Sequence, residues 1–497
     1  MPNVDEGRSE NIPRRSFLKG TGVAAGAGAL GTLAGCLGSS GEDGGGGSNG
    51  SGGGSGPITV SYLSAKAAES SQVQQKFKES MTNFQNQHEN IQTDLQTASY
   101  GDIKNKLSST VGAGNQPSIA EAGTAGLQFY FDGASPSHRQ WIEGTEGYPD
   151  NWSVTNRQAA SFRNEWWSGG APAGALRGIN IVPRLVSKVG VSDPLTEMAT
   201  WSGVYDVIKK VDDQLDTIAW ETSGTANDLE GYWSKARTAY TNGDDPWFRG
   251  EPTDPTVLMG NEPRTDGMVK NTIKLAKEFS SPNAASLADE EKPAMLITGR
   301  AAMFSHGGAG IDSYTGVKQD AKFGWQDGQG DIMYIPEPKV DPAYGSTIGI
   351  PELDGVEGSH GAHISALENS HVIFETNDQK EMDAAWELNT YVQRNKNHQI
   401  PINGETGRGI PLYTPMLDTF IKELNPPQTF AQALKTFDEL GPQATATGSA
   451  WDLKQTDQIR WTDINETISQ GLAGQHKLEE VPNIIRQRIL QTLGKTG

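Results

Sequence analysis

The sequence contains almost no cysteine: Cys36 is the single one among 497 residues. A disulfide bond within the chain is therefore excluded. Positive charge is also scarce, because 41 Lys and Arg stand against 61 Asp and Glu and leave a formal net charge of −20. So acidic a chain is not expected to bind nucleic acid by neutralising phosphates, and the same sign argues against a face that attracts anionic lipid.

Long apolar runs and catalytic motifs are absent as well. Residues 57–497 contain no apolar stretch of membrane-spanning length, no Gly-x-Ser-x-Gly and no His-Glu-x-x-His. His360 and His363 form a His-x-x-His pair, but a zinc site would need further ligands and no cysteine is left to supply one. Asp327 opens the pattern of a calcium loop, yet Pro338 takes the place of the closing Glu. The sequence thus predicts no catalytic residue, no metal and no cofactor.

The first 36 residues resemble an export signal that ends in a lipid-attachment cysteine. Arg14 and Arg15 lie in Pro13-Arg14-Arg15-Ser16-Phe17-Leu18-Lys19, which resembles the twin-arginine motif. The Gly/Ala-rich apolar run that follows is too short to span a bilayer, and it ends in Leu33-Ala34-Gly35-Cys36, which resembles a lipobox. We expect residues 1–35 to be a signal peptide of the twin-arginine route, and Cys36 to carry a lipid on the extracellular face of the cell membrane.

Residues 36–56 are predicted to form a tether between this anchor and the body. They consist almost entirely of Gly, Ser, Asn and acidic residues, a composition that cannot bury apolar surface. A lipoprotein signal of the twin-arginine type, such a tether and an acidic body together resemble the product of a halophilic archaeon. High salt screens the repulsion on a strongly charged surface, which then stays soluble.

The body opens with alternating strand and helix patterns. Apolar residues alternate with polar ones at 58–62 and 91–95, as in half-buried strands. Apolar residues spaced by three and four positions predict helices at 70–84 and 100–111, and a short third strand is predicted at 117–120. This order predicts a parallel sheet flanked by helices, whose ligand lies beyond the carboxyl ends of the strands.

Further short motifs follow in order along nearly the whole body. They are the turn Gly114-Asn115-Gln116-Pro117, the helix opened by Thr200-Trp201, the strands Ile297-Thr298-Gly299-Arg300-Ala301-Ala302-Met303-Phe304 and Gly330-Asp331-Ile332-Met333-Tyr334-Ile335-Pro336, a helix at 380–392, Gly409-Ile410-Pro411 and a terminal helix at 478–493. In this order the motifs resemble extracellular solute-binding protein family 1, the receptors of carbohydrate ABC importers.

The resemblance implies an α/β, two-lobed periplasmic-binding-protein-like fold. Each lobe would be a sheet flanked by helices, and crossover hinge strands would join the two. Lobe I would comprise 57–170 and 359–411, and lobe II 171–358 and 412–497. The resemblance further implies a monomeric, non-enzymatic subunit. It would capture a mono- or oligosaccharide in an interlobe cleft by domain closure and deliver it to ABC permease subunits.

Two departures from the family pattern concern the ligand. Ser118 stands where the family often has Asp, and no Trp follows the Ala-Ala-Met strand, so a particular sugar specificity cannot be carried over. Aromatic residues beside glycines suit stacking on a sugar face, and polar residues after strand ends can hydrogen-bond its hydroxyls. The predicted ligand-binding residues are Ser64, Glu69, Glu121, Thr124, Trp166, Trp167, His306 and Trp325.

Two other classes of function stay open from the residues alone. One is a surface polysaccharide-degrading enzyme, for which paired acids such as Asp212-Asp213 or Asp244-Asp245 could serve only at a suitable separation in space. The other is a binding protein for a non-sugar solute such as a peptide, a polyamine or a metal chelate, because a fold does not determine its ligand.

Replacing the lipid acceptor tests the anchor. We expect Cys36→Ser to release the protein from the membrane, because a hydroxyl cannot replace the thiol to which the lipid is attached. The measurement is the distribution of the protein between washed membranes and the soluble fraction. Retention of the variant in washed membranes would contradict the anchor.

Overall fold

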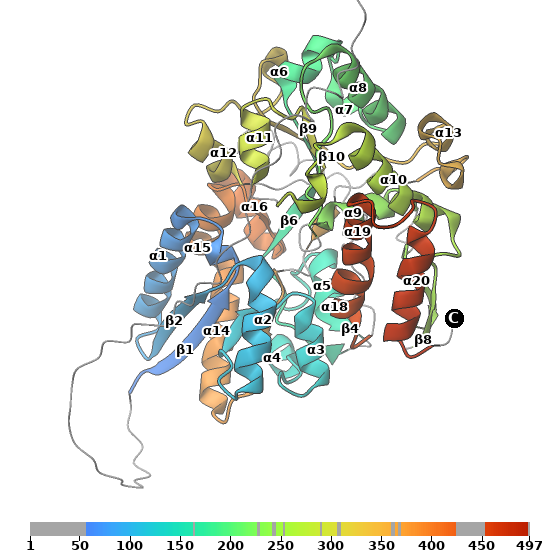
Figure 1. Ribbon diagram of the computed structural model, residues 1–497. Helices are drawn as coiled ribbons and strands as arrows, with labels where there is room; N and C mark the ends of the chain where they lie inside the picture. Colours follow the sequence, from blue (N-terminus) through green and yellow to red (C-terminus); the bar gives the residue numbers. More distant parts are fainter. Residues whose placement is uncertain are drawn as a thin grey trace, which may run out of the picture. The chain divides into compact units, whose positions relative to one another are not determined.

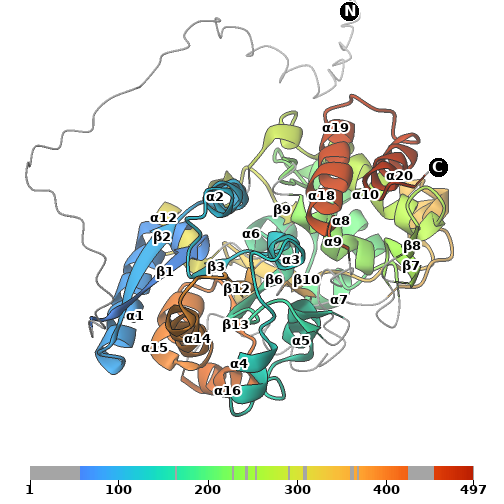
Figure 2. The same cartoon turned by 90° about the horizontal axis from the view of Figure 1, so that it is seen from below.

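Two sheets organise the described part of the chain. The computed structural model describes residues 56–162, 165–225, 229–240, 245–251, 254–288, 291–305, 310–358, 363–365, 369–423 and 453–495. The first sheet has the strand order β12-β3-β1-β2, and the second joins β6 to β9, β10, β11 and β13. We call the elements packed on the first sheet the first lobe and those packed on the second sheet the second lobe (Figures 1 and 2).

The first sheet confirms the strands predicted at the start of the body. β1 (Ile58–Ser64) pairs in parallel with β2 (Ile91–Thr97) and with β3 (Ile119–Glu121). β12 (His371–Ile373) comes from much later in the sequence and pairs antiparallel with β3. A short ribbon of β4 (Ser161–Phe162) and β5 (Glu165–Trp166) lies outside this sheet.

Amphipathic helices cover the first sheet. In α1 (Ser71–Gln87) the Ser70 hydroxyl accepts a hydrogen bond from Val73 N at 3.1 Å and caps the helix, as predicted. α14 (Gln379–Arg394) packs against β1 although some three hundred residues separate them, and Figure 1 shows it beside α1 and β1. The other helices of this lobe are α2 (Tyr100–Gly112), α3 (Ala125–Phe131), α4 (Arg139–Gly144), α5 (Val154–Ala160), α15 (Lys396–Gln399) and α16 (Thr414–Glu423).

The second sheet is built on one long strand, β6 (Ala173–Ile181). Its first residues pair with β13 (Ile410–Pro411), its middle with β11 (His363–Ser365), and its last residues with β9 (Met303–Ser305) and β10 (Met333–Pro336). From β11 the chain continues to β12 in the first sheet. β6, the β11–β12 segment and β13 therefore connect the two lobes.

Helices from distant parts of the sequence enclose the second sheet. α8 (Trp201–Gln214) begins after Thr200, as predicted, and Trp201 is fully buried. Both views place α19 and α20, which come near the end of the chain, close to α9 and α10 (Figures 1 and 2). The further elements are α6 (Pro183–Val186), α7 (Pro194–Glu197), α9 (Glu230–Arg237), β7 (Phe248–Glu251), β8 (Asp254–Val257), α10 (Pro263–Phe279), α11 (Lys292–Ile297), α12 (Ile311–Val317), α13 (Tyr344–Ile348), α18 (Thr456–Gln458), η11 (Ile459–Glu466), α19 (Thr467–Leu472) and α20 (Val481–Thr492).

One helix packs differently from the predicted division of the chain. The predicted second lobe resumes at residue 412, yet α16 packs against α14 and α15, and its Leu417 and Phe420 belong to a hydrophobic cluster that includes Leu63 of β1. In the described structure α16 is thus part of the first lobe.

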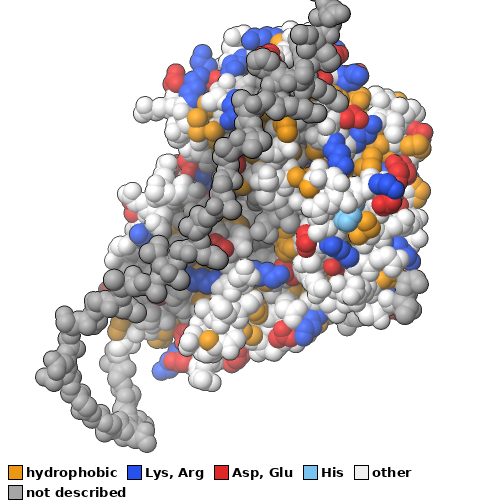
Figure 3. All heavy atoms as spheres, in the orientation of Figure 1, with side chains coloured by type: hydrophobic (Ala, Val, Ile, Leu, Met, Phe, Trp, Pro, Cys, Tyr) orange, Lys and Arg blue, Asp and Glu red, His pale blue; other side chains and the backbone are white. Residues whose placement is uncertain are grey.

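The surface carries both signs of charge. On the visible face, Lys and Arg side chains alternate with Asp and Glu outside the grey atoms, so the net negative charge is not gathered into one patch there (Figure 3). Among the described helices, none combines the length and the apolar character needed to cross a membrane.

Candidate functional site

The loop that follows β1 is held in place by a buried carboxylate. Glu121, at the end of β3, is 4 % exposed and accepts hydrogen bonds from the backbone N–H groups of Ala65 (2.7 Å) and Lys66 (2.8 Å). Its other oxygen accepts from the hydroxyl groups of Ser64 (2.8 Å) and Tyr62 (3.0 Å). These bonds join the carboxyl ends of two neighbouring parallel strands, where the sequence predicted a ligand.

The surroundings of Glu121 favour its charged form. Burial by itself raises the pKa of this carboxyl group, but His371, 3.9 Å away, and the hydrogen bonds from Lys66 and Ser64 lower it below its usual value. Because the pKa is lowered on folding, Glu121 stabilises the fold at pH values above its unfolded pKa. This contribution is lost as the pH falls through the lower pKa of the folded state.

Arg408 connects three segments next to β13. Its Nε donates to Asp312 Oδ1 at 2.9 Å, at the start of α12, and a terminal nitrogen donates to the Ser313 hydroxyl at 2.7 Å. Another nitrogen bonds to Glu69 in the loop after β1. The side chains of Arg408 and Asp312 are only 10 % and 4 % exposed. Ser70 also donates to Asp312 (2.8 Å), so elements of both lobes meet around one guanidinium group.

A second group of contacts joins the lobes at α3 and α18. The Thr124 hydroxyl donates to Asp457 Oδ1 at 2.7 Å and accepts from the indole nitrogen of Trp461 at 3.3 Å. Lys104 of α2 forms an ion pair with the other oxygen of Asp457. Thr124 and Asp457 are 5 % and 7 % exposed. The predicted ligand residue Thr124 is therefore engaged with the other lobe in this conformation.

Of the predicted tryptophans, Trp167 lies in the interior of the first lobe and Trp166 packs against another aromatic ring of that lobe. Trp167 is fully buried in a cluster with Ala122, and its ring lies against Gly126. Trp166, in β5, is half-buried and meets the ring of Trp152 edge to face, at 5.7 Å between centroids. A stacking role for Trp167 would require the side chain to leave this position, so its assignment to the ligand stays a prediction that the geometry does not favour.

Trp325 lies at the end of the second sheet that is far from the first lobe. It is partly buried, and its carbonyl accepts from Gly330 N just before β10, whose first residues pair with the last residues of β6. This placement also does not favour a contact with ligand. His306 lies outside the described residues.

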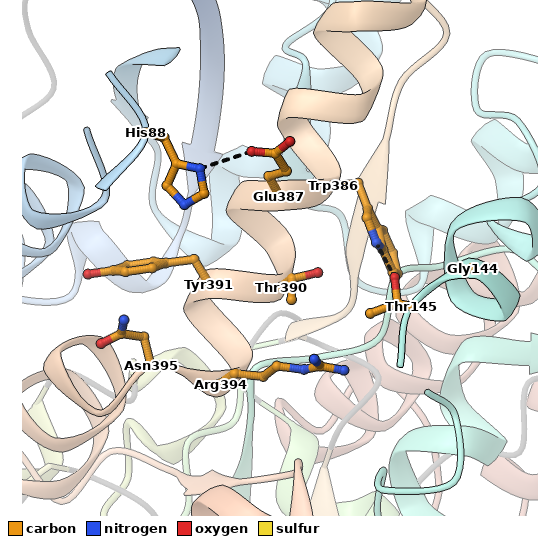
Figure 4. A pocket seen from close by; sticks show the side chains of 9 residues that line it. All are labelled: His88, Gly144, Thr145, Trp386, Glu387, Thr390, Tyr391, Arg394 and Asn395. Carbon is orange, nitrogen blue, oxygen red and sulfur yellow. Dashed lines mark hydrogen bonds and ion pairs between the residues drawn. The ribbon is translucent and has the colours of Figure 1, made fainter. Parts of the chain in front are cut away.

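A pocket of about 440 Å³ opens on the outer side of α14 (Figure 4). His88 forms an ion pair with Glu387 at 3.0 Å across it, and the indole nitrogen of Trp386 donates to the Thr145 hydroxyl at 2.8 Å. None of the predicted ligand residues lines this pocket. It is therefore separate from the strand ends at which the two lobes meet.

No metal site is seen within the described residues, since no three His, Cys, Asp or Glu side chains are grouped as ligands would be. Of the paired histidines in the sequence, His360 lies outside that part, and His363 belongs to β11.

Comparisons with solved structures identify the architecture. An ABC transporter solute-binding protein of Thermotoga lettingae, bound to α-D-tagatose, superposes with a TM-score of 0.64 at 18% identity, covering 88% of this chain and 100% of the other. A sugar transporter protein of Arthrobacter chlorophenolicus with bound laminaribiose gives 0.66 at 14% identity, with 88% and 99% covered. Maltose-bound MalE3 of T. maritima gives 0.65 at 12% identity, with 87% and 98% covered.

The chain has the fold of the sugar-binding proteins of ABC transporters. The predicted two-lobed periplasmic-binding-protein-like fold is confirmed, and these neighbours support the resemblance to solute-binding protein family 1. Residues 11–31 match the family described as TAT (twin-arginine translocation) pathway signal sequence, so the chain carries the predicted export signal. A sequence search finds no match among curated proteins.

Within this binding-protein fold, the residues that join the lobes were not predicted from the sequence. Arg408, Asp312 and Asp457 were not among the predicted site residues. Their partners are distant in the sequence, so no local pattern could have shown these pairs. Ser64 and Glu121 were predicted as ligand residues, and in the structure they bond to each other and to the loop.

Removing the charge of Glu121 should loosen the loop after β1. We expect Glu121→Gln to lower the free energy of unfolding by about 1–3 kcal/mol at pH 7, because an amide cannot accept all the bonds that the carboxylate accepts. The difference from the wild type should shrink as the pH falls through the lowered pKa of the folded carboxyl group, where the wild type also takes up a proton. Urea unfolding at pH 7 and pH 3 measures both effects. The exposed Glu79→Gln is the matched control and should leave the midpoint unchanged at either pH, whereas an equal loss for both variants would contradict the anchoring role.

The contacts of Arg408 should contribute strongly to stability. We expect Arg408→Gln to cost about 3 kcal/mol, because it leaves two largely buried carboxylates without a counter-charge. Arg408→Lys should cost less but not restore the wild type, since an ammonium group cannot bond two carboxylates and a hydroxyl in the same geometry. Chemical unfolding measures the stability of both variants. The control is Arg139→Gln, which removes one partner of an exposed ion pair and should leave the free energy of unfolding unchanged. A lysine variant as stable as the wild type would show that the fork geometry is not needed.

Proposed function

We propose that this protein is the lipid-anchored solute-binding subunit of an ABC importer for a carbohydrate. The observation that carries the proposal is the match of nearly nine-tenths of the chain to the fold of proteins solved with tagatose, laminaribiose and maltose. The twin-arginine signal at residues 11–31 supports a place of action outside the cytoplasm. The same neighbours are binding proteins of transporters, which supports a non-enzymatic role.

The solute binds between the lobes, and the lobes close on it. Support comes from the connections at β6, β11–β12 and β13, because a few segments that cross between two compact parts can absorb a rotation. Gly407, with φ +67°, precedes β13 in a backbone conformation that suits glycine. The contacts of Arg408 and of Thr124 join residues of the two lobes, so they belong to the conformation in which the lobes meet. We divide the chain as predicted, with α16 assigned to the first lobe.

Cys36 tethers the protein to the extracellular face of the cell membrane, where it works as a monomer. The glycine-rich segment 36–56 lets the body turn while the lipid holds it near the permease subunits that receive the solute. Support for the anchor comes from the position of Cys36 directly after the export signal and from its being the single cysteine. Support for the permease comes from the neighbours' role in ABC transport.

A thermal-shift screen of the purified protein tests the solute class. We expect D-tagatose, maltose, laminaribiose or a related sugar to raise the melting temperature, because a ligand at 100 times its Kd stabilises the native state by about 2.7 kcal/mol. Peptides, polyamines and metal chelates, screened in low and high salt, are the controls and should give no shift. Shifts with these alone would contradict the carbohydrate assignment. Release of shorter products from a polysaccharide would contradict the binding role itself.

A further inference from the structure

The carboxyl ends of several strands meet at one edge of the second sheet. β9 and β10 both run antiparallel to β6, and their last residues pair with Ile179 and Gly178, towards the end of β6 that joins β11 and β13. The segment ending at Glu221 runs parallel to β9, since Glu221 bridges to Phe304, so it ends at the same edge. In α/β sheets of this kind, ligands bind outside the carboxyl ends of the strands.

Three polar side chains are buried at or next to this edge. Glu337 directly follows β10, Trp220 directly precedes Glu221, and Lys235 lies in α9; their exposed fractions are 0, 0 and 1 %. Among the described residues, the two carboxylate oxygens of Glu337 and the indole nitrogen of Trp220 have no hydrogen-bond partner. Burying a polar group without a partner costs free energy, and a carboxylate costs more than a neutral group. Such a group is expected where it binds a ligand and does not serve the stability of the fold.

Lys235 lies close to both of the other groups without a direct bond to Glu337. Its ammonium nitrogen is 4.7 Å from the ring centroid of Trp220 and 5.7 Å from that of Trp201, which is the geometry of cation–π contacts. Burial raises the pKa of Glu337 and lowers that of Lys235, and the charge of each opposes the shift of the other. Yet no ion pair or hydrogen bond joins the two among those recorded for the described residues. A group that bonds to both would complete the arrangement.

A purely structural ion pair would look different. Two buried charges offset their loss of hydration only when they are in contact and their remaining bonding capacity is satisfied. Lys270 and Glu352 of the same lobe meet the first requirement, direct contact, with 2.5 Å between nitrogen and oxygen, although Glu352 Oε2 has no partner among the described residues. Lys235 and Glu337 do not, so their burial is not explained by mutual stabilisation.

We propose that Glu337, Lys235 and Trp220 form the second lobe's part of the solute site and bind hydroxyl groups of a neutral, polyhydroxylated solute. The inference rests on the proposed function and names the groups that select the solute. A hydroxyl oxygen accepts from the Lys235 ammonium while its proton is donated to the Glu337 carboxylate, each at about 2.8 Å. The Trp220 indole N–H is free to donate to a further solute oxygen.

The same three groups discriminate against charged solutes. A polyamine would be attracted by Glu337 but repelled by Lys235, and an anion such as a sugar phosphate would meet the reverse, so for either ion the repulsion offsets the attraction in a buried, weakly screened setting. A hydroxyl group is both donor and acceptor, so it satisfies the two opposite charges at once. A solute without hydroxyl groups would leave the carboxylate unpaired and would be rejected for that reason.

A double variant that removes both charges tests the proposal in the full-length protein. Lys235→Met combined with Glu337→Gln keeps the side-chain volumes similar and leaves no uncompensated charge. Lys270→Met combined with Glu352→Gln is the matched control, because it removes a partly buried pair of the same lobe that is in direct contact. Titration calorimetry with maltose, laminaribiose and D-tagatose gives the Kd, and the melting temperature without ligand reports on the fold.

The expected result is a Kd weakened about 10–100-fold in the Lys235/Glu337 variant and unchanged in the control, as for the loss of charge-assisted hydrogen bonds. Without ligand, the Lys235/Glu337 variant should melt at or above the wild-type temperature, whereas the control should melt lower. An unchanged Kd in the Lys235/Glu337 variant would overturn the site while leaving the proposed function intact. A lower melting temperature of that variant without ligand would also overturn it, since the pair would then be structural.

The failure of the proposed function gives a different pattern. A wild-type protein that binds a peptide or a polyamine and none of the three sugars would refute the carbohydrate assignment, and the hydroxyl recognition proposed for Lys235 and Glu337 would be overturned with it. A wild-type protein that binds a sugar leaves the comparison of the two double variants to decide the site alone.

Discussion

The pairing of β6 along its whole length is the constraint on which the rest of the structure depends. One strand of nine residues carries β13 and β11 at its beginning and β9 and β10 at its end. Because β13 and β11 pair with the first part of β6, and β9 and β10 with its last residues, the chain crosses between the lobes in adjacent segments. β9 and β10 run antiparallel to β6, so their carboxyl ends lie towards those crossings.

Each lobe buries a carboxylate near the junction, but the two carboxylates differ in their hydrogen bonding. In the first lobe Glu121 is buried with its oxygens fully bonded, and it uses them to hold the loop after β1. In the second lobe Glu337 is equally buried, and its oxygens have no hydrogen-bond partner in the part of the chain that the structure describes. A satisfied carboxylate makes a rigid support, whereas an unsatisfied one is ready to bind. Glu121 therefore suits a rigid support in the first lobe, and Glu337 suits a recognition surface in the second lobe.

Local patterns in the sequence predicted individual elements well. The helices α1, α8 and α14 were visible because the 3.6-residue periodicity of their apolar stripes acts within one or two turns. Trp201 and Trp386 are buried on such stripes. The assignment of Trp325 and Trp167 to the ligand stays a prediction that their positions do not favour, because a glycine beside a tryptophan marks a turn but does not say which way the ring points. The position of α16 was missed for a similar reason, since its apolar face fits either lobe until the packing of α14 and α15 decides between them.

The sequence by itself determined the export signal, the acidic charge balance, the order of strands and helices and the class of fold. These depend on composition and on contacts between residues near each other along the chain. Only the tertiary structure decided which charges are paired: Arg408 with Asp312 and Glu69, Asp457 with Lys104, and Glu337 with no group among the described residues. The physical reason is that the energy of a charge depends on its burial and on partners that are distant in sequence, and neither is encoded in any short segment.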